Sequence, residues 1–192
     1  MTASRTLWGN VMSLASRILT YAAIALALFA LAREAKAVTC LGALPPASIA
    51  PGWAVMADST RSGRMGSKIS YDTYDGAVEE LQGKGIVAFA QRMYRNASTG
   101  QYVTVDVYEL ASKAAAGSLY AEKLADSRNA KSLSTYTSIK DKAFVGTLGS
   151  ISLGCCTRGK YLCEVTMTKA PGSQHRTTVR KFVSVISGKL AP

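Results

Sequence analysis

Residues 86–110 read IVAFAQRMYRNASTGQYVTVDVYEL. Two strand-like runs, residues 86–95 and 101–110, flank the segment NASTG, which has the length and composition of a hairpin loop. In the second run three valines alternate with polar or aromatic residues: Val103, Val105 and Val107 against Thr104, Asp106 and Tyr108. Such alternation is typical of a half-buried antiparallel strand. The fold is therefore expected to be built on an antiparallel hairpin.

Helical patterns lie on both sides of this hairpin. Residues 74–81 place apolar side chains on one stripe and stop at glycines, which predicts a short helix. Residues 112–127 predict a longer helix with Ser112 as its N-cap. Residues 174–190 carry the strongest helical spacing, formed by Val179, Phe182, Val183, Ile186 and Leu190. The chain is expected to close with a C-terminal amphipathic helix.

The remaining strand candidates lie between the last two helices. Residues 132–137 and 144–148 predict short strands, and residues 150–156 and 161–169 predict a second hairpin around TRGK. Residues 61–68 mix glycine, serine and basic residues, so an exposed loop is expected there. This order of helices and hairpins predicts the α+β class: an antiparallel sheet with helices packed on it.

Residues 1–37 have the parts of a secretory signal peptide. A basic start is followed by an uncharged run, ILTYAAIALALFALA, over residues 18–32. Ala35 and Ala37 supply the small residues of a cleavage site, so the mature chain is expected to begin at Val38. The alternative is an uncleaved signal anchor, in which a longer helix starting near Leu7 tolerates Arg17 by snorkelling.

The part after the signal is expected to have two portions. Residues 40–52 contain three of the five prolines, so a Pro-rich arm over residues 38–52 should run extended across the surface. Residues 53–192 are expected to form a single α+β domain, since a chain of this length suits one hydrophobic core. No cofactor is needed to hold such a core together.

The composition is basic, with 23 Lys and Arg against 12 Asp and Glu, a formal charge of +11. Such a balance favours anionic neighbours, for example an envelope polymer, a membrane surface or an acidic protein. The last predicted helix adds a basic face with Arg176, Arg180, Lys181 and Lys189, for which simple solvation is the plainer interpretation. Nucleic-acid binding is not expected, because only residues 92–102 bring bases and tyrosines together and export argues against it.

All four cysteines, Cys40, Cys155, Cys156 and Cys163, follow the predicted cleavage point. An even number of cysteines in an oxidising compartment predicts structural disulfides. Adjacent cysteines pair poorly with each other, since a disulfide needs Cα atoms about 5–6 Å apart. Cys155 and Cys156 should thus have different partners, one at Cys163 and the other at Cys40.

No catalytic or metal-binding constellation stands out. His175 is the only histidine and follows a Pro-Gly turn, not a nucleophile elbow. Zinc binding by the cysteines is not expected, because the usual C-x₂-C spacing is missing. Glu79 and Glu80 diverge by about 100° on a helix and should form a solvated face. No catalytic residue, cofactor or metal is therefore assigned.

One segment resembles a known family. The words that carry the resemblance lie in residues 71–120: DGAVE at 75–79, Gly85-Ile86, Tyr94, VTVDVY at 103–108, Ser112, Ala116-Gly117 and Tyr120, with a looser match at residues 159–162. They resemble a family of exported bacterial proteins classed only as a domain of unknown function. The resemblance implies export and an α+β fold, and it implies no reaction.

These observations favour an exported bacterial envelope protein, periplasmic or secreted, that binds a partner, a polymer or an apolar small ligand without catalysis. Two alternatives stay open. One is an accessory subunit held at the inner membrane by its N-terminal helix, and the other is an enzyme with an unrecognised site. A pocket gathering Asp106, Glu109 or His175 would favour the enzyme.

Overall fold

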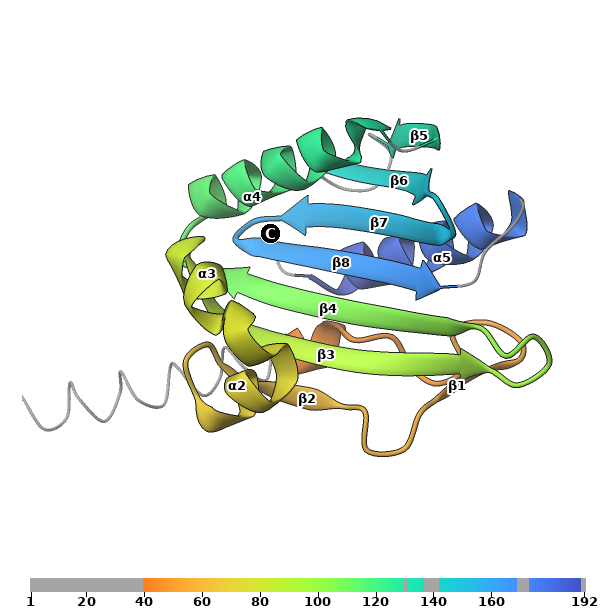
Figure 1. Ribbon diagram of the computed structural model, residues 1–192, viewed down its shortest axis with the longest axis horizontal. Coiled ribbons are helices and arrows are strands. Elements are labelled where there is room, and N and C mark those ends of the chain that lie inside the picture. Colours follow the sequence, from red (N-terminus) through yellow and green to blue (C-terminus); the bar gives the residue numbers. More distant parts are fainter. Residues whose placement is uncertain (1–39, 130, 137–141, 169–172, 191–192) are drawn as a thin grey trace, which may run out of the picture. The chain divides into compact units, whose positions relative to one another are not determined.

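The computed structural model describes residues 40–129, 131–136, 142–168 and 173–190, all within a compact unit that spans Ala37–Pro192. The unit is built on an eight-stranded antiparallel sheet (Figure 1). Its strands are β1 (Trp53–Val55), β2 (Arg61–Arg64), β3 (Ile86–Asn96), β4 (Tyr102–Leu110), β5 (Lys131–Tyr136), β6 (Lys142–Leu148), β7 (Ile151–Arg158) and β8 (Tyr161–Thr168). They pair in the order β1-β3-β4-β8-β7-β6-β5, with β2 also on β3.

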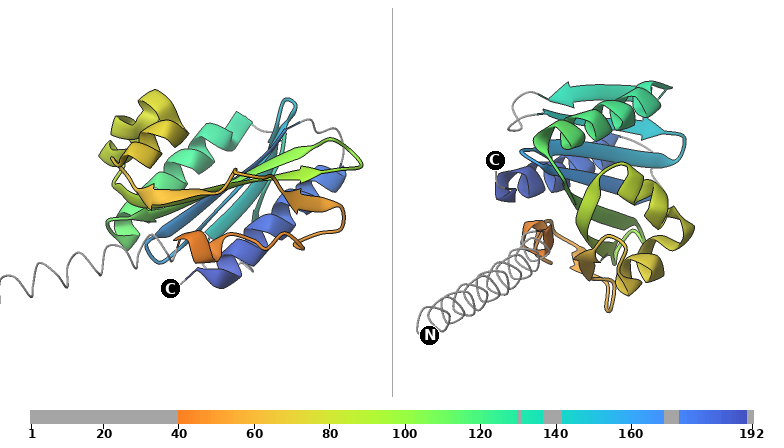
Figure 2. Two further views of the ribbon diagram at one scale, coloured as in Figure 1. Left: turned by 90° about the horizontal axis from the view of Figure 1, so that it is seen from below. Right: turned by 90° about the vertical axis from the view of Figure 1, so that its left-hand side faces the viewer.

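Helices pack on both faces of the sheet, which confirms the α+β class. In Figure 2, α2 (Lys68–Tyr74), α3 (Val78–Gly83) and α4 (Lys113–Asp126) lie on one face, and α5 (Ser173–Lys189) lies on the other. A short 3₁₀ turn joins α2 to α3 (Asp75–Ala77), and another follows α4 (Ser127–Asn129). No described helix is long and apolar enough to cross a membrane.

Each face of the sheet has its own hydrophobic core because strand side chains alternate between faces. The valines of β4, Val103, Val105 and Val107, pack with Phe182 and Ile186 of α5. On the other face, the buried side chains of α4 meet aromatic residues of the sheet; this cluster includes Ala116, Leu119, Tyr120, Phe89, Tyr108 and Phe144. The alternation predicted for residues 101–110 is therefore confirmed.

The long helices follow their sequence signals closely. The Ser112 side chain accepts a hydrogen bond from the Ala115 backbone N–H at 3.1 Å, as expected of an N-cap. The five apolar positions predicted to face the core from α5 are all buried. The predicted hairpins are confirmed as β3–β4 and β7–β8.

Two local predictions are wrong. Residues 61–68 do not form a loop: β2 pairs with β3, with Gly63 opposite Phe89, and α2 begins at Lys68. The helix expected over residues 74–81 is broken into α2, a 3₁₀ turn and α3 because Asp75 has a left-handed φ of 48°. The four residues of β2, Arg-Ser-Gly-Arg, carry no alternation of apolar and polar side chains, so the strand is recognised only by its pairing with β3.

The N-terminal arm also differs from its prediction. Residues 40–43 are helical, and Leu44 and Ile49 are buried in the α5-side core. The Pro45 carbonyl accepts a hydrogen bond of 2.7 Å from the Tyr94 hydroxyl, and Lys189 Nζ donates to the Leu44 carbonyl at 2.9 Å. The arm is thus part of the core packing, because removing its apolar side chains from water stabilises the fold.

Candidate functional site

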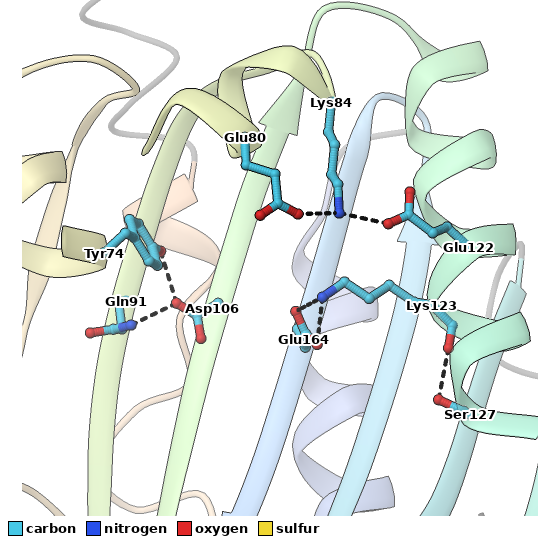
Figure 3. A network of polar contacts seen from close by, with 9 residues as sticks. All are labelled: Tyr74, Glu80, Lys84, Gln91, Asp106, Glu122, Lys123, Ser127 and Glu164. Carbon is cyan, nitrogen blue, oxygen red and sulfur yellow. Dashed lines mark hydrogen bonds and ion pairs between the residues drawn. The ribbon is translucent and has the colours of Figure 1, made fainter. Parts of the chain in front are cut away.

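A row of polar side chains crosses the middle of the face that carries α2, α3 and α4. Gln91 of β3, Asp106 of β4 and Glu164 of β8 are directly opposite one another in the pairing register. Asp106 Oδ1 accepts hydrogen bonds from the Tyr74 hydroxyl and from Gln91 Nε2, both at 2.8 Å (Figure 3). Burial raises the pKa of Asp106 to about 6, although these two hydrogen bonds oppose the shift.

Two lysines connect this row to the helices. Lys123 of α4 forms an ion pair of 3.0 Å with Glu164. Lys84, at the end of α3, bridges Glu80 at 2.9 Å and Glu122 of α4 at 2.6 Å (Figure 3). These two carboxylates raise the pKa of Lys84. Each charged group drawn in this network already has a partner, so the network serves to hold α4 against the sheet and α3.

The opposite flank of α4 borders a cavity. Four residues of the helix at i, i+3, i+4 and i+7 line it, Gly117, Tyr120, Ala121 and Leu124, together with Thr135 and Tyr136 of β5 and Lys142 and Ala143 of β6. Its volume is about 330 Å³. A second cavity of about 300 Å³ is lined by Lys113, Gly117, Lys142, Thr157 and Gly159. Gly117 and Lys142 line both, so the two cavities adjoin; together they are called the α4 pocket below.

Gly117 keeps this flank of α4 open. A Cβ atom built on it would meet no heavy atom within 4 Å, so a side chain there would extend into open space. Glycine inside a helix costs roughly 0.5–1 kcal/mol relative to alanine. Gly117, the α4 residue that lines both cavities, is therefore unfavourable for the helix itself.

All four cysteines are buried. Cys156 and Cys163 are directly opposite each other on β7 and β8, and their sulfur atoms are 2.8 Å apart. Cys155 packs in the α4-side core, whereas Cys40 packs in the α5-side core. Strand alternation therefore places Cys155 on the opposite face of the sheet from both Cys40 and Cys163, its two candidate partners. The structure brings Cys156 and Cys163 together but, among the residues it describes, shows no sulfur pair at disulfide bonding distance.

Cys40 lies near the ion pair of Glu109 and Lys160. Glu109 is fully buried, and its carboxylate is 2.9 Å from Lys160 Nζ. Burial and the Glu109 charge raise the pKa of the Cys40 thiol to about 12. Such a thiol is a poor nucleophile at neutral pH, because the thiolate is the reactive form.

The three residues named as markers of an enzyme do not come together. Asp106 and Glu109 are three positions apart on β4 and face opposite sides of the sheet. His175 lies in the first turn of α5, where its Nδ1 is 3.2 Å from the Gln101 side-chain nitrogen. Within residues 40–129, 131–136, 142–168 and 173–190, no cluster of three metal-ligating side chains occurs.

Much of the basic face of α5 is used inside the molecule. Arg176 donates to the Ser134 hydroxyl at 2.7 Å, and the Arg180 guanidinium lies 4.4 Å from the centre of the Tyr136 ring. Lys189 donates a hydrogen bond to the Leu44 carbonyl of the N-terminal arm. Lys181 stays exposed. The cleavage-site residues Ala35, Ala37 and Val38 lie outside the described residues.

Sequence reasoning missed the α4 pocket. Gly117 gave the only local signal, as an unfavourable glycine within a helical stripe. Lys113 and Lys142 are ordinary surface lysines in the sequence, and only the placement of α4 over β6 and β7 brings them to one cavity.

Comparison with known proteins gives a likeness of fold alone. No family model matches the chain, and no curated protein matches it. Among solved structures, the chain is similar to the extracellular domain of PknH from Mycobacterium tuberculosis, with a TM-score of 0.50 and 8% identity. The match covers 79% of this chain and 96% of that one.

Proposed function

We propose that this chain is an exported binding domain of the bacterial envelope and that it holds a small ligand in the α4 pocket. The observation that carries the proposal is the pair of adjoining cavities, about 330 and 300 Å³, that share Gly117 and Lys142. Ligand sites in proteins are mostly apolar hollows of about 300–1,000 Å³ with a few polar groups.

Three further observations support export and binding. The fold resembles one found in an extracellular domain. The N-terminal sequence has the pattern of a signal peptide, and residues 71–120 resemble an exported family. The polar network of Figure 3 is internally paired, which suits a structural role for that flank of α4.

Native mass spectrometry tests the proposal. The full chain is expressed in a bacterium, recovered from the envelope, and weighed under native and denaturing conditions. We expect a noncovalent adduct that is lost on denaturation. Gly117→Leu and Ala121→Phe, which fill the pocket, should lose the adduct.

Gly188→Leu is the matched control, since Gly188 is also a helical glycine with open space around it. It should keep the adduct. The proposal is overturned by a wild-type protein without an adduct, both as purified and after incubation with a small-molecule extract of the envelope. Folded Gly117→Leu protein that retains the adduct would overturn it equally.

A further inference from the structure

The lining of the α4 pocket divides into an apolar part and a cationic part. The larger cavity is lined chiefly by carbon: Tyr120 and Leu124 from α4 and Ala143 from β6. Of these, Tyr120 is a buried residue of the α4-side core, so the floor of the cavity is continuous with that core. This part offers no described charge except Lys142 at its border.

The smaller cavity carries the positive charge. Lys113 and Lys142 both line it, beside Thr157 and Gly159. No described Asp or Glu lines either cavity, and neither lysine forms an ion pair with a described carboxylate. Two nearby carboxylates are paired on the other flank of α4: Glu122 with Lys84, and Glu164 with Lys123 (Figure 3). Among the described lining residues the charged ones are thus the two lysines, which attract an anionic group.

The cavity sizes limit the ligand. Volumes of about 330 and 300 Å³ are at the low end for ligand sites, so they suit one slender apolar chain with a head group and not a two-chain lipid. Burying such a chain against Tyr120 and Leu124 stabilises the complex, and the head group stays at the lysines.

We propose that the α4 pocket binds a small single-chain amphiphile with an anionic head group. The chain lies in the larger cavity against Tyr120 and Leu124, and the head group lies in the smaller cavity between Lys113 and Lys142. This inference rests on the proposed function, because it names the ligand class of the same site.

Calorimetric titration with sodium decanoate and with decanol, both below the concentration at which they aggregate, tests the assignment. We expect the wild-type protein to bind decanoate at least about tenfold more tightly than decanol, as a charge-assisted contact provides. Lys142→Gln should weaken decanoate binding by a similar factor and leave decanol binding unchanged. Lys181→Gln, which removes an exposed lysine of α5, should alter neither.

The contrary results distinguish failure of the anionic ligand class from failure of the proposed function. Equal binding of decanoate and decanol overturns the anionic ligand class, and so does a Lys142→Gln protein that binds decanoate as tightly as the wild type. Neither result contradicts the proposed function, which is tested by the Gly117-dependent adduct in native mass spectrometry. No binding of decanoate overturns the inference outright. A different result would point to a membrane surface as the anionic partner: the protein fails to bind decanoate but co-sediments with phosphatidylglycerol vesicles, and Gly117→Leu does not reduce this co-sedimentation.

Discussion

Asp106 is a carboxyl group placed where its ionised form is disfavoured. It lies between Gln91 and Glu164 in the sheet, beneath Tyr74. Burial raises its pKa from the ordinary 3.8 to about 6, and the Glu164 charge adds to the rise. The folded protein therefore keeps a proton on Asp106 in a pH range where the unfolded chain has released it.

This shift predicts a pH-dependent term in stability. Because the folded-state pKa is the higher one, the stabilising contribution is complete below about pH 4 and is lost as the pH rises to about 6. Asp106→Asn keeps the Oδ1 atom that accepts both hydrogen bonds, so the variant should lack this fall. Urea unfolding of both proteins from pH 4 to 7 measures the free energy of unfolding at each pH. If it changes with pH in the same way for both proteins, Asp106 is not the group responsible for the fall.

The cysteines support a second prediction at this scale. Directly opposed residues of antiparallel strands have Cα atoms about 4.5–5.5 Å apart, which suits a disulfide. We expect oxidised glutathione to convert the two thiols of Cys156 and Cys163 to one disulfide, releasing two reduced glutathione molecules. The reaction should be slow, since burial raises the pKa of Cys163 well above its ordinary value and thiolate is the reacting form.

Peptide mass mapping after mild oxidation checks this pairing. Cys155→Ser should still form the bridge, and Cys156→Ser should not. A bridge that includes Cys155 would contradict the strand register, in which Cys155 faces the α4-side core.

At the scale of elements, α4 is a helix held by charge on one flank and open on the other. Lys84 and Lys123 hold the first flank through Glu122 and Glu164. Gly117, Ala121 and Leu124 line the pocket on the second. The position of the pocket wall therefore depends on ion pairs that do not touch it.

Lys123→Gln is expected to loosen α4. The Lys123 and Glu164 side chains are only 30% and 28% exposed, and without Lys123 the Glu164 charge is left beside Asp106. The loss of stability should be about 1–2 kcal/mol. Lys68→Gln is the matched control, because the Lys68–Asp72 pair is exposed and should contribute little. Chemical denaturation measures both, and equal effects of the two variants would contradict this role.

Helix α5 depends on a close approach to β7. A Cβ atom at Gly154 would lie 2.6 Å from Val179 Cγ1 and 2.8 Å from Val183 Cγ2, both on β-branched side chains with little freedom to move. Gly154→Ala should therefore destabilise the protein by about 1–3 kcal/mol. Gly117→Ala, with open space at the same atom, should be neutral or stabilising. Thermal unfolding of the two variants compares them directly.

At the scale of the whole molecule, the sheet has two covered faces and each has its own core. The residues that build both cores all lie within the unit that spans Ala37–Pro192.

The chain recovered from a bacterial envelope is thus expected to start at Val38, because the 15-residue apolar run is shorter than the roughly 20 residues of a spanning helix. Intact-mass spectrometry measures the mature start. Leucine at both Ala35 and Ala37 should block cleavage and give the full-length mass. A wild-type protein that keeps Met1 or Thr2 would favour the anchored accessory subunit instead.

Local patterns were enough for the elements that carry their own periodicity. The β3–β4 hairpin, the cap and stripe of α4 and the buried stripe of α5 could be predicted because alternation and helical spacing are properties of neighbouring residues. The strand β2 and the break at Asp75 could not, since the first is held by pairing with β3 and the second depends on a positive backbone φ at a residue other than glycine.

By itself, the amino-acid sequence determined the α+β class, the two hairpins and the helix that closes the domain. Only the tertiary structure decided that Cys40 and Cys155 belong to different cores, that apolar side chains of the proline-rich arm such as Leu44 and Ile49 are buried, and that Lys113 and Lys142 border one pocket. The physical reason is range: periodicity is encoded between residues a few positions apart, whereas a cavity is formed by side chains from strands and helices whose pairing no short segment specifies.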